Sequence, residues 1–170
     1  FSIALYDLAA KLKDLTIMEL IGKTEAREIE GMPVVHKSEP AKMGSVSKVW
    51  CDTFNYKHLK PKLSSNLEHS RQALGHIREE VGDEVTLQVD FNYAYTNARQ
   101  CITDMNKLHE EFNIVMFEDP IRPTLQLYPL PFIRKEISTC LLVDGVAYWP
   151  NIIRLCHADG ADRFNQHTNA

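Results

Sequence analysis

The chain opens on leucines at helical spacing. Between residues 5 and 15 a leucine recurs every three or four positions, which predicts an amphipathic helix over residues 3–12. Gly22 is the first residue that favours an end to this helical segment. The charged stretch at 23–30 is typical of a solvated connector, and we expect no packed element there.

After residue 30 the pattern becomes an alternation of short β-rich apolar runs and amphipathic stretches. Strands are expected at 31–36, 56–63, 85–90, 114–117, 140–143 and 162–167. Helices are expected behind the capping-box pattern Ser65–Glu68, behind Thr96 and around Pro150, with a looser helical segment at 125–137 and a loop at 37–45.

Strands that alternate with helices imply a parallel sheet with right-handed crossovers. Polar residues end the successive strands at intervals of 28, 28, 26 and 23 residues, namely Lys62, Asp90, Glu118, Asp144 and His167. This is about the length of one strand–helix unit in a (β/α)₈ barrel of roughly 250 residues. A flavodoxin-like sheet is the competing layout. We favour the barrel, since barrel sites are built from polar residues at strand ends, and six strands make it incomplete.

Composition and charge argue against several classes of partner. Nineteen Lys and Arg face 23 Asp and Glu, and no basic stripe is present, so we expect no nucleic-acid partner. The apolar runs are too short to span a membrane. The four cysteines lack the close spacing of zinc ligands, and we expect them to be reduced thiols of a cytoplasmic protein.

Three carboxylates end three consecutive expected strands: Asp90, Glu118 and Asp144. If they converge at one rim they repel one another unless a cation lies between them. Oxygen ligands alone suit a hard ion such as Mg²⁺. Taken singly, each residue could equally be a helix cap or a loop acid, but three in register favour a metal site.

Two lysines lie on one face of the strand expected at 56–63. Lys60 and Lys62 flank Pro61, so alternation points both lysines the same way. Burial and a neighbouring positive charge both lower the pKa of a lysine, which prepares it to act as a base. The alternative is a pair of surface lysines at a strand edge.

In this order the motifs resemble the mandelate racemase/muconate lactonizing branch of the enolase superfamily. The resemblance rests on the helix at 3–11, Lys60-Pro61-Lys62, residues 85–92, Phe117-Glu118-Asp119-Pro120, residues 141–144 and residues 161–165. It implies that residues 1–28 end an N-terminal α+β capping domain and that residues 29–170 form a partial (β/α) barrel.

The resemblance also implies a reaction: divalent-metal-assisted abstraction of a proton next to a carboxylate, through an enediolate. The activity would be that of a racemase or epimerase, a cycloisomerase or an acid-sugar dehydratase. Asp90, Glu118 and Asp144 would bind Mg²⁺, with Mn²⁺ as a substitute. Lys62 would move the proton, and Lys60 would lower its pKa and hold the substrate carboxylate. The expected partners are a small-molecule carboxylate and, by family resemblance, further copies of the chain.

Some residues depart from the family's pattern. His167 stands where many relatives carry a second lysine, and both an acid–base role and no role remain open. Pro61 removes a hydrogen bond from a strand, and Gly145 stands where relatives often have Glu. Asn92 and Asp119 would orient ligands or water. The alternative to an enzyme is a non-catalytic or degenerate barrel fragment with a structural or binding role.

Overall fold

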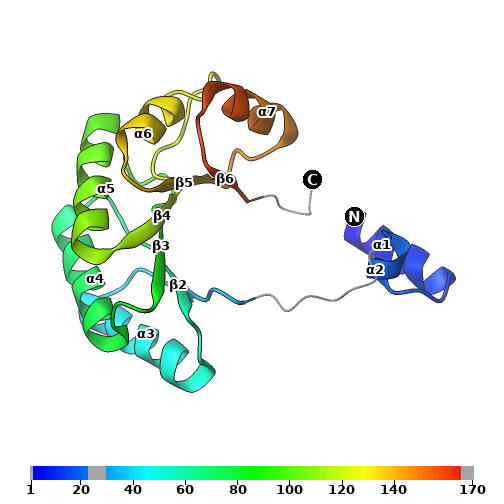
Figure 1. The fold of residues 1–170 in the computed structure, drawn as a ribbon, viewed down its shortest axis with the longest axis horizontal. Helices are drawn as coiled ribbons and strands as arrows, with labels where there is room; N and C mark the ends of the chain where they lie inside the picture. Colours follow the sequence, from blue (N-terminus) through cyan, green and yellow to red (C-terminus); the bar gives the residue numbers. More distant parts are fainter. Residues whose placement is uncertain (1, 23–29, 166–170) are drawn as a thin grey trace. The chain divides into compact units, whose positions relative to one another are not determined.

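A computed structural model of the chain describes residues 2–22 and 30–165 (Figure 1). These residues fall into two compact units, one up to Glu30 and one from Gly31 to Asn165. The first unit contains α1 (Ser2–Leu12) and α2 (Ile17–Leu20), so the helix predicted at 3–12 is confirmed. Within the described ranges, no helix combines the length and apolar character that a membrane crossing needs.

The second unit is built on a parallel sheet of six strands. They are β1 (Val34–Val35), β2 (His58–Pro61), β3 (Thr86–Asp90), β4 (Ile114–Glu118), β5 (Cys140–Val143) and β6 (Arg163–Phe164). Each strand pairs with the next in chain order. A flavodoxin-like sheet would place its first strands out of order, so this competing layout is wrong. Sequential parallel strands are the order of a (β/α)₈ barrel, here incomplete.

A helix follows each of the first five strands. These helices are α3 (Pro40–Phe54), α4 (Leu67–Val81), α5 (Ala98–Phe112), α6 (Leu130–Glu136) and α7 (Trp149–Ala158). Figure 1 shows α3 to α6 lying around one side of the sheet. Side chains from the strands and from these helices form the core, among them Leu59, Leu87, Val89, Phe117, Leu141, Leu74, Ile77, Met105, Leu108 and Ile133, all fully buried. The sheet's opposite face is therefore left to carry the polar residues.

The helix α3 contradicts the loop predicted at 37–45. Pro40 lies in its first turn, where a proline is tolerated, and Gly44 weakens the helical pattern. The structure explains this glycine: a Cβ at Gly44 would lie 2.7 Å from the backbone oxygen of His76 in α4. Close contact between two helices thus selects a residue that helical propensity disfavours.

Two predicted helix caps are wrong by one residue. The amide oxygen of Asn66, not Ser65, accepts a hydrogen bond from the N–H of His69 at 3.1 Å. In the same way Asn97, rather than Thr96, caps α5. The cap belongs to whichever polar side chain directly precedes the first helical residue, and asparagine serves there as well as serine or threonine.

A β-bulge in β4 sets the register of the site. Leu87 pairs with Ile114, whereas the next residue, Gln88, pairs with Met116. Val115 is therefore an extra residue, and it is exposed rather than buried in the core. Since the bulge shifts the alternation by one, Glu118 faces the same side as its partner Asp90.

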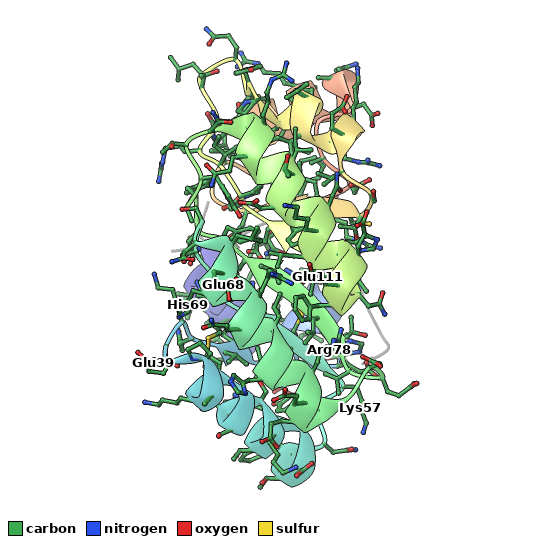
Figure 2. The ribbon with its side chains drawn as sticks, turned by 90° about the vertical axis from the view of Figure 1, so that its left-hand side faces the viewer. Glu39, Lys57, Glu68, His69, Arg78 and Glu111 are labelled. Carbon is green, nitrogen blue, oxygen red and sulfur yellow. The ribbon has the colours of Figure 1, made fainter. Side chains whose placement is uncertain are left out.

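Arg78 ties the helices together at the amino-terminal end of the strands. Its guanidinium donates to the carbonyls of Phe112 at 2.8 Å, Val85 at 2.7 Å and Gly82 at 2.9 Å. Figure 2 shows Arg78 near the carboxyl end of α4, beside α5. Its half-buried setting lowers the pKa of Arg78 through desolvation. This anchor lies at the end of the unit opposite to the candidate site.

Candidate functional site

The polar residues lie at the carboxyl ends of β2, β3, β4 and β5. Lys62 pairs with Asp90, and Asp90 with Glu118, across neighbouring parallel strands. Glu118 pairs in turn with Leu142, and Asp144 comes two residues later. Partners in register face the same side of a sheet, and alternation adds Lys60 to that side. The sheet thus places Lys60, Lys62, Asp90 and Glu118 along one face, away from the helices, and Asp144 lies in the turn directly after β5.

Glu118 is buried and surrounded by donors. Only 2% of its side chain is exposed. Its Oε2 accepts hydrogen bonds from Lys60 Nζ at 2.9 Å and from Gln88 Nε2 at 2.7 Å. Its Oε1 accepts one from Asn165 Nδ2 at 3.2 Å. A buried carboxylate is costly unless it is paired and hydrogen-bonded, and these donors on three strands or strand ends offset that cost.

Asp90 is held in a closed triangle with Lys62 and Asn92. Its side chain is 3% exposed, and its Oδ2 lies 3.1 Å from Lys62 Nζ. The backbone N–H of Asn92 donates to Asp90 Oδ1 at 2.9 Å, and Asn92 Oδ1 accepts from Lys62 Nζ at 2.7 Å. The backbone of Asn92 is left-handed, with φ 45°, and its side chain contacts both Lys62 and Asp90. The triangle fixes where Lys62 presents its ammonium group.

The two lysines are inside the sheet's polar face, not at a surface strand edge. The side chains of Lys60 and Lys62 are 17% and 30% exposed, and β2 has a strand on either side. Pro61 has no N–H to donate, but the hydrogen bonds from β2 to β1 come from the flanking lysines. The N–H of Lys60 donates to Pro33 O, and the N–H of Lys62 donates to Val35 O.

Asp119 connects β4 to the turn after β5. It is buried with a left-handed backbone, φ 41°. Its Oδ1 accepts a hydrogen bond from the N–H of Asp144 at 3.0 Å, and its Oδ2 accepts one from the N–H of Gly145 at 2.9 Å. One carboxylate therefore holds two consecutive amides beside the third predicted metal ligand.

Sequence reasoning missed Gln88, Asn165 and Tyr93. Gln88 interrupts an apolar run two residues before Asp90, so alternation could have assigned it to the polar face. Asn165 lies at the end of β6, and only the tertiary structure brings it to Glu118. Tyr93 gives no signal in the sequence. His167 lies outside the described residues.

The donor chemistry fits a hard divalent cation. Four carboxylates (Asp90, Glu118, Asp119 and Asp144) and two lysines lie at these strand ends, a formal charge of −2, and the carboxylates offer oxygen atoms as ligands. Across 2–22 and 30–165, however, no three His, Cys, Asp or Glu side chains are gathered into a cluster that could hold a metal. Asp90 and Glu118 instead contact lysines. Metal binding by Asp90, Glu118 and Asp144 therefore stays a prediction.

A cavity of about 760 Å³ lies beside the site rather than at it. It is formed by the connection from β3 to α5 and the connection from β4 to α6, and Tyr93, Tyr95, Arg122 and Tyr128 are among its lining residues. None of the lysines or strand-end acids lines it. Tyr93 lines the cavity, and its hydroxyl lies beside Gly145 in the turn after β5.

Known proteins resemble this chain in sequence. Residues 45–165 match the family model "Enolase C-terminal domain-like". The chain is 30% identical over 146 residues to the D-Ala-D/L-Ala epimerase of Cytophaga hutchinsonii, covering 85% of this chain and 38% of that protein. It is 24% identical over 167 residues to the N-succinyl-L-Arg/Lys racemase of Bacillus cereus, covering 96% and 44%. The chain thus spans less than half the length of these relatives.

Solved structures show the same arrangement of elements. The dipeptide epimerase of Cytophaga hutchinsonii, complexed with Mg and the dipeptide D-Ala-L-Val, superposes with a TM-score of 0.85 at 29% identity, over 96% of this chain and 44% of that one. The 3,6-anhydro-D-galactonate cycloisomerase of Zobellia galactanivorans shares the fold, with a TM-score of 0.84 at 22% identity over 95% and 45%. By the extent of the match over residues 45–165, the chain belongs to the enolase C-terminal domain-like family, of the mandelate racemase/muconate lactonizing type.

Proposed function

We propose that this chain carries the metal-binding half of an enzyme that abstracts a proton next to a carboxylate, through an enediolate. The observation that carries the proposal is the pairing of two buried acids with two lysines on one face: Lys60 with Glu118 at 2.9 Å and Lys62 with Asp90 at 3.1 Å. A merely structural strand end has no need for two buried acids paired with lysines, since apolar residues fill such positions at lower cost.

Asp90, Glu118 and Asp144 would hold the cation, Mg²⁺ by preference and Mn²⁺ as a substitute. When bound, the cation supplies positive charge that offsets the negative charge developing on the substrate's carboxylate oxygens. The formal −2 of the surrounding side chains supports a doubly charged ion at this place. Gln88 and Asn165 would keep Glu118 oriented through their hydrogen bonds.

Lys62 would take or return the proton at its Nζ. Asn92 Oδ1 and Asp90 Oδ2 hold this nitrogen from one side, while 30% of the side chain remains exposed to a substrate. Lys60, the more buried of the two, would bind the substrate carboxylate and add positive charge near Lys62. Geometry of this kind places a base at a fixed point on the rim, which proton transfer requires.

The substrate would be a small molecule with a carboxylate. The relatives include an epimerase of D-Ala-D/L-Ala and a structure with a dipeptide, which supports dipeptides as the first substrates to test. Racemase, cycloisomerase and acid-sugar dehydratase activities belong to the same proposal. A non-catalytic barrel fragment is the less favoured alternative, because both acid–lysine pairs are intact.

The proposal also covers the domain organisation, cellular location and oligomeric state of the protein. Residues 1–28 would end a capping domain and residues 29–170 would form a partial barrel. The four free cysteines support a cytoplasmic protein, and family membership supports a homo-oligomer.

Exchange of the substrate's α-proton with solvent tests the proposal. The chain is incubated with D-Ala-L-Ala in D₂O with and without Mg²⁺, and loss of the α-proton signal is followed by NMR. We expect Mg²⁺-dependent exchange that Lys62→Ala abolishes. Lys57→Ala is the matched control, because Lys57 is an exposed residue directly before the same strand (Figure 2). Exchange that survives in Lys62→Ala would rule out the role of this lysine.

A further inference from the structure

Tyr93 adopts a backbone conformation that a tyrosine rarely takes. Its φ is 64°, in the left-handed region, directly after Asn92 at 45°. Such a conformation costs a non-glycine residue about 1–2 kcal/mol, so the surroundings must hold it. The N–H of Tyr93 donates to the backbone oxygen of Asp119 at 2.7 Å, which supplies part of that support.

The ring of Tyr93 is fixed between two neighbours. The guanidinium carbon of Arg122 lies 4.5 Å from the ring centroid, a cation–π contact. On the other side the hydroxyl reaches over Gly145, where an added Cβ would collide with Tyr93 Oη and lie 3.2 Å from Asp119 Oδ2. Residue 145 is therefore a glycine for reasons of space, because the Tyr93 hydroxyl occupies the volume that a side chain would need.

The hydroxyl of Tyr93 and the carboxylate of Asp119 meet at the same turn. Burial, and then the charge of Asp119, raises the pKa of the Tyr93 hydroxyl. Asp119 in turn binds the N–H groups of Asp144 and Gly145. The hydroxyl of Tyr93 packs over Gly145 in this turn, and the carboxylate of Asp119 links the turn to the end of β4 through hydrogen bonds.

We propose that Tyr93 and Asp119 are positioning residues that fix the turn at Asp144 and Gly145, and so set where the Asp144 carboxylate stands at the rim of the sheet. The inference deepens the proposed function and rests on it, because the placement of Asp144 matters most if its carboxylate binds a cation. Neither Tyr93 nor Asp119 needs to touch the cation or the substrate to have this effect.

Two Asp119 variants test the fastening. Asp119→Ala removes both acceptors. Asp119→Asn tolerates the left-handed backbone but keeps only one acceptor oxygen. Amide hydrogen exchange by NMR should show at least about tenfold faster exchange at Asp144 and Gly145 in Asp119→Ala, and a smaller change in Asp119→Asn. Mn²⁺ affinity, followed by electron paramagnetic resonance, should fall about 10–100-fold in Asp119→Ala, the range seen when groups that orient metal ligands are lost.

A rescue experiment tests the role of Tyr93. Gly145→Ala should weaken Mn²⁺ binding, because the new methyl group collides with the hydroxyl of Tyr93. Adding Tyr93→Phe removes the nearest atom and leaves the ring Cζ at 3.0 Å from the new Cβ, so the double variant should bind Mn²⁺ more tightly than Gly145→Ala alone. A double variant that binds as weakly as the single one would overturn the role of the hydroxyl.

The two proposals fail in different ways. If the wild-type chain binds Mn²⁺ and Asp119→Ala leaves both that affinity and the two amide exchange rates unchanged, the positioning role is wrong. If the wild-type chain binds no Mn²⁺, the proposed function is wrong. In that case the exchange rates at Asp144 and Gly145 still decide whether Asp119 holds the turn.

Discussion

Lys60 Nζ lies 2.9 Å from Glu118 Oε2, although the two residues belong to β2 and β4, which are separated by β3. Neighbouring strands are about 4.8 Å apart, so the lysine spans about 10 Å of sheet to reach its partner. Gln88 on the intervening strand donates to the same oxygen at 2.7 Å. Three strands thus share one buried carboxylate, and the polar face is a connected unit rather than a row of separate strand ends.

Lys60 and Glu118 should be energetically coupled. Lys60→Met leaves Glu118 buried with one donor fewer, and we expect it to lower the free energy of unfolding by about 1–3 kcal/mol. The double variant Lys60→Met/Glu118→Gln also removes the buried charge. Its decrease in the free energy of unfolding should therefore be smaller than the sum of the decreases in the two single variants. Urea unfolding of the four proteins measures this cycle, and strict additivity would mean that the contact is energetically silent.

Arg78 and Arg71 provide a matched comparison on one helix. Arg78 donates to several backbone carbonyls, and Arg78→Ala should destabilise the chain by about 2–4 kcal/mol. Arg71 contacts Glu111 at 2.7 Å on the exposed surface, so Arg71→Ala should cost about 0–1 kcal/mol. Figure 2 shows Arg78 and Glu111 on the surface formed by α4 and α5. Equal midpoints in thermal unfolding would contradict the anchoring role of Arg78.

Gly44 and Gly75 should respond to alanine in opposite directions. A Cβ at Gly44 would lie 2.7 Å from the backbone of His76, so Gly44→Ala should destabilise the packing of α3 on α4 by about 1–3 kcal/mol. A Cβ at Gly75 would meet nothing within 4 Å, and Gly75→Ala should stabilise α4 by about 0.5–1 kcal/mol. Calorimetric melting of both variants measures whether each substitution raises or lowers the stability. A stabilising effect of Gly44→Ala would refute the close contact.

Much of the polar face could be predicted from the sequence, because alternation along parallel strands depends on local order alone. Asp90 and Glu118 each follow an apolar run, and the spacing of Lys60 and Lys62 places them on one side. The register nevertheless required a bulge at Val115, which no local pattern indicates. The alternation in β4 agrees with the site only because this extra residue is present.

The parts that could not be predicted depend on contacts between distant segments. The helix α3 was not predicted because Gly44 weakens its helical pattern. A glycine is needed at this position because the backbone of His76, in another helix, lies close to it. The hydroxyl of Tyr93 explains why residue 145 is a glycine, but the two residues are separated along the chain by two strands and two helices. Pairs of this kind leave no periodic signal, because each residue looks unremarkable without its partner.

Titration of the chain with Mg²⁺ by calorimetry tests whether the strand-end carboxylates hold a cation. We expect saturable binding of one Mg²⁺ by the wild-type chain, weakened at least about tenfold in Asp90→Asn and in Glu118→Gln, and unchanged in Lys57→Ala. The absence of binding by a folded wild-type chain, or equal affinity in the wild type and the two carboxylate variants, would contradict it.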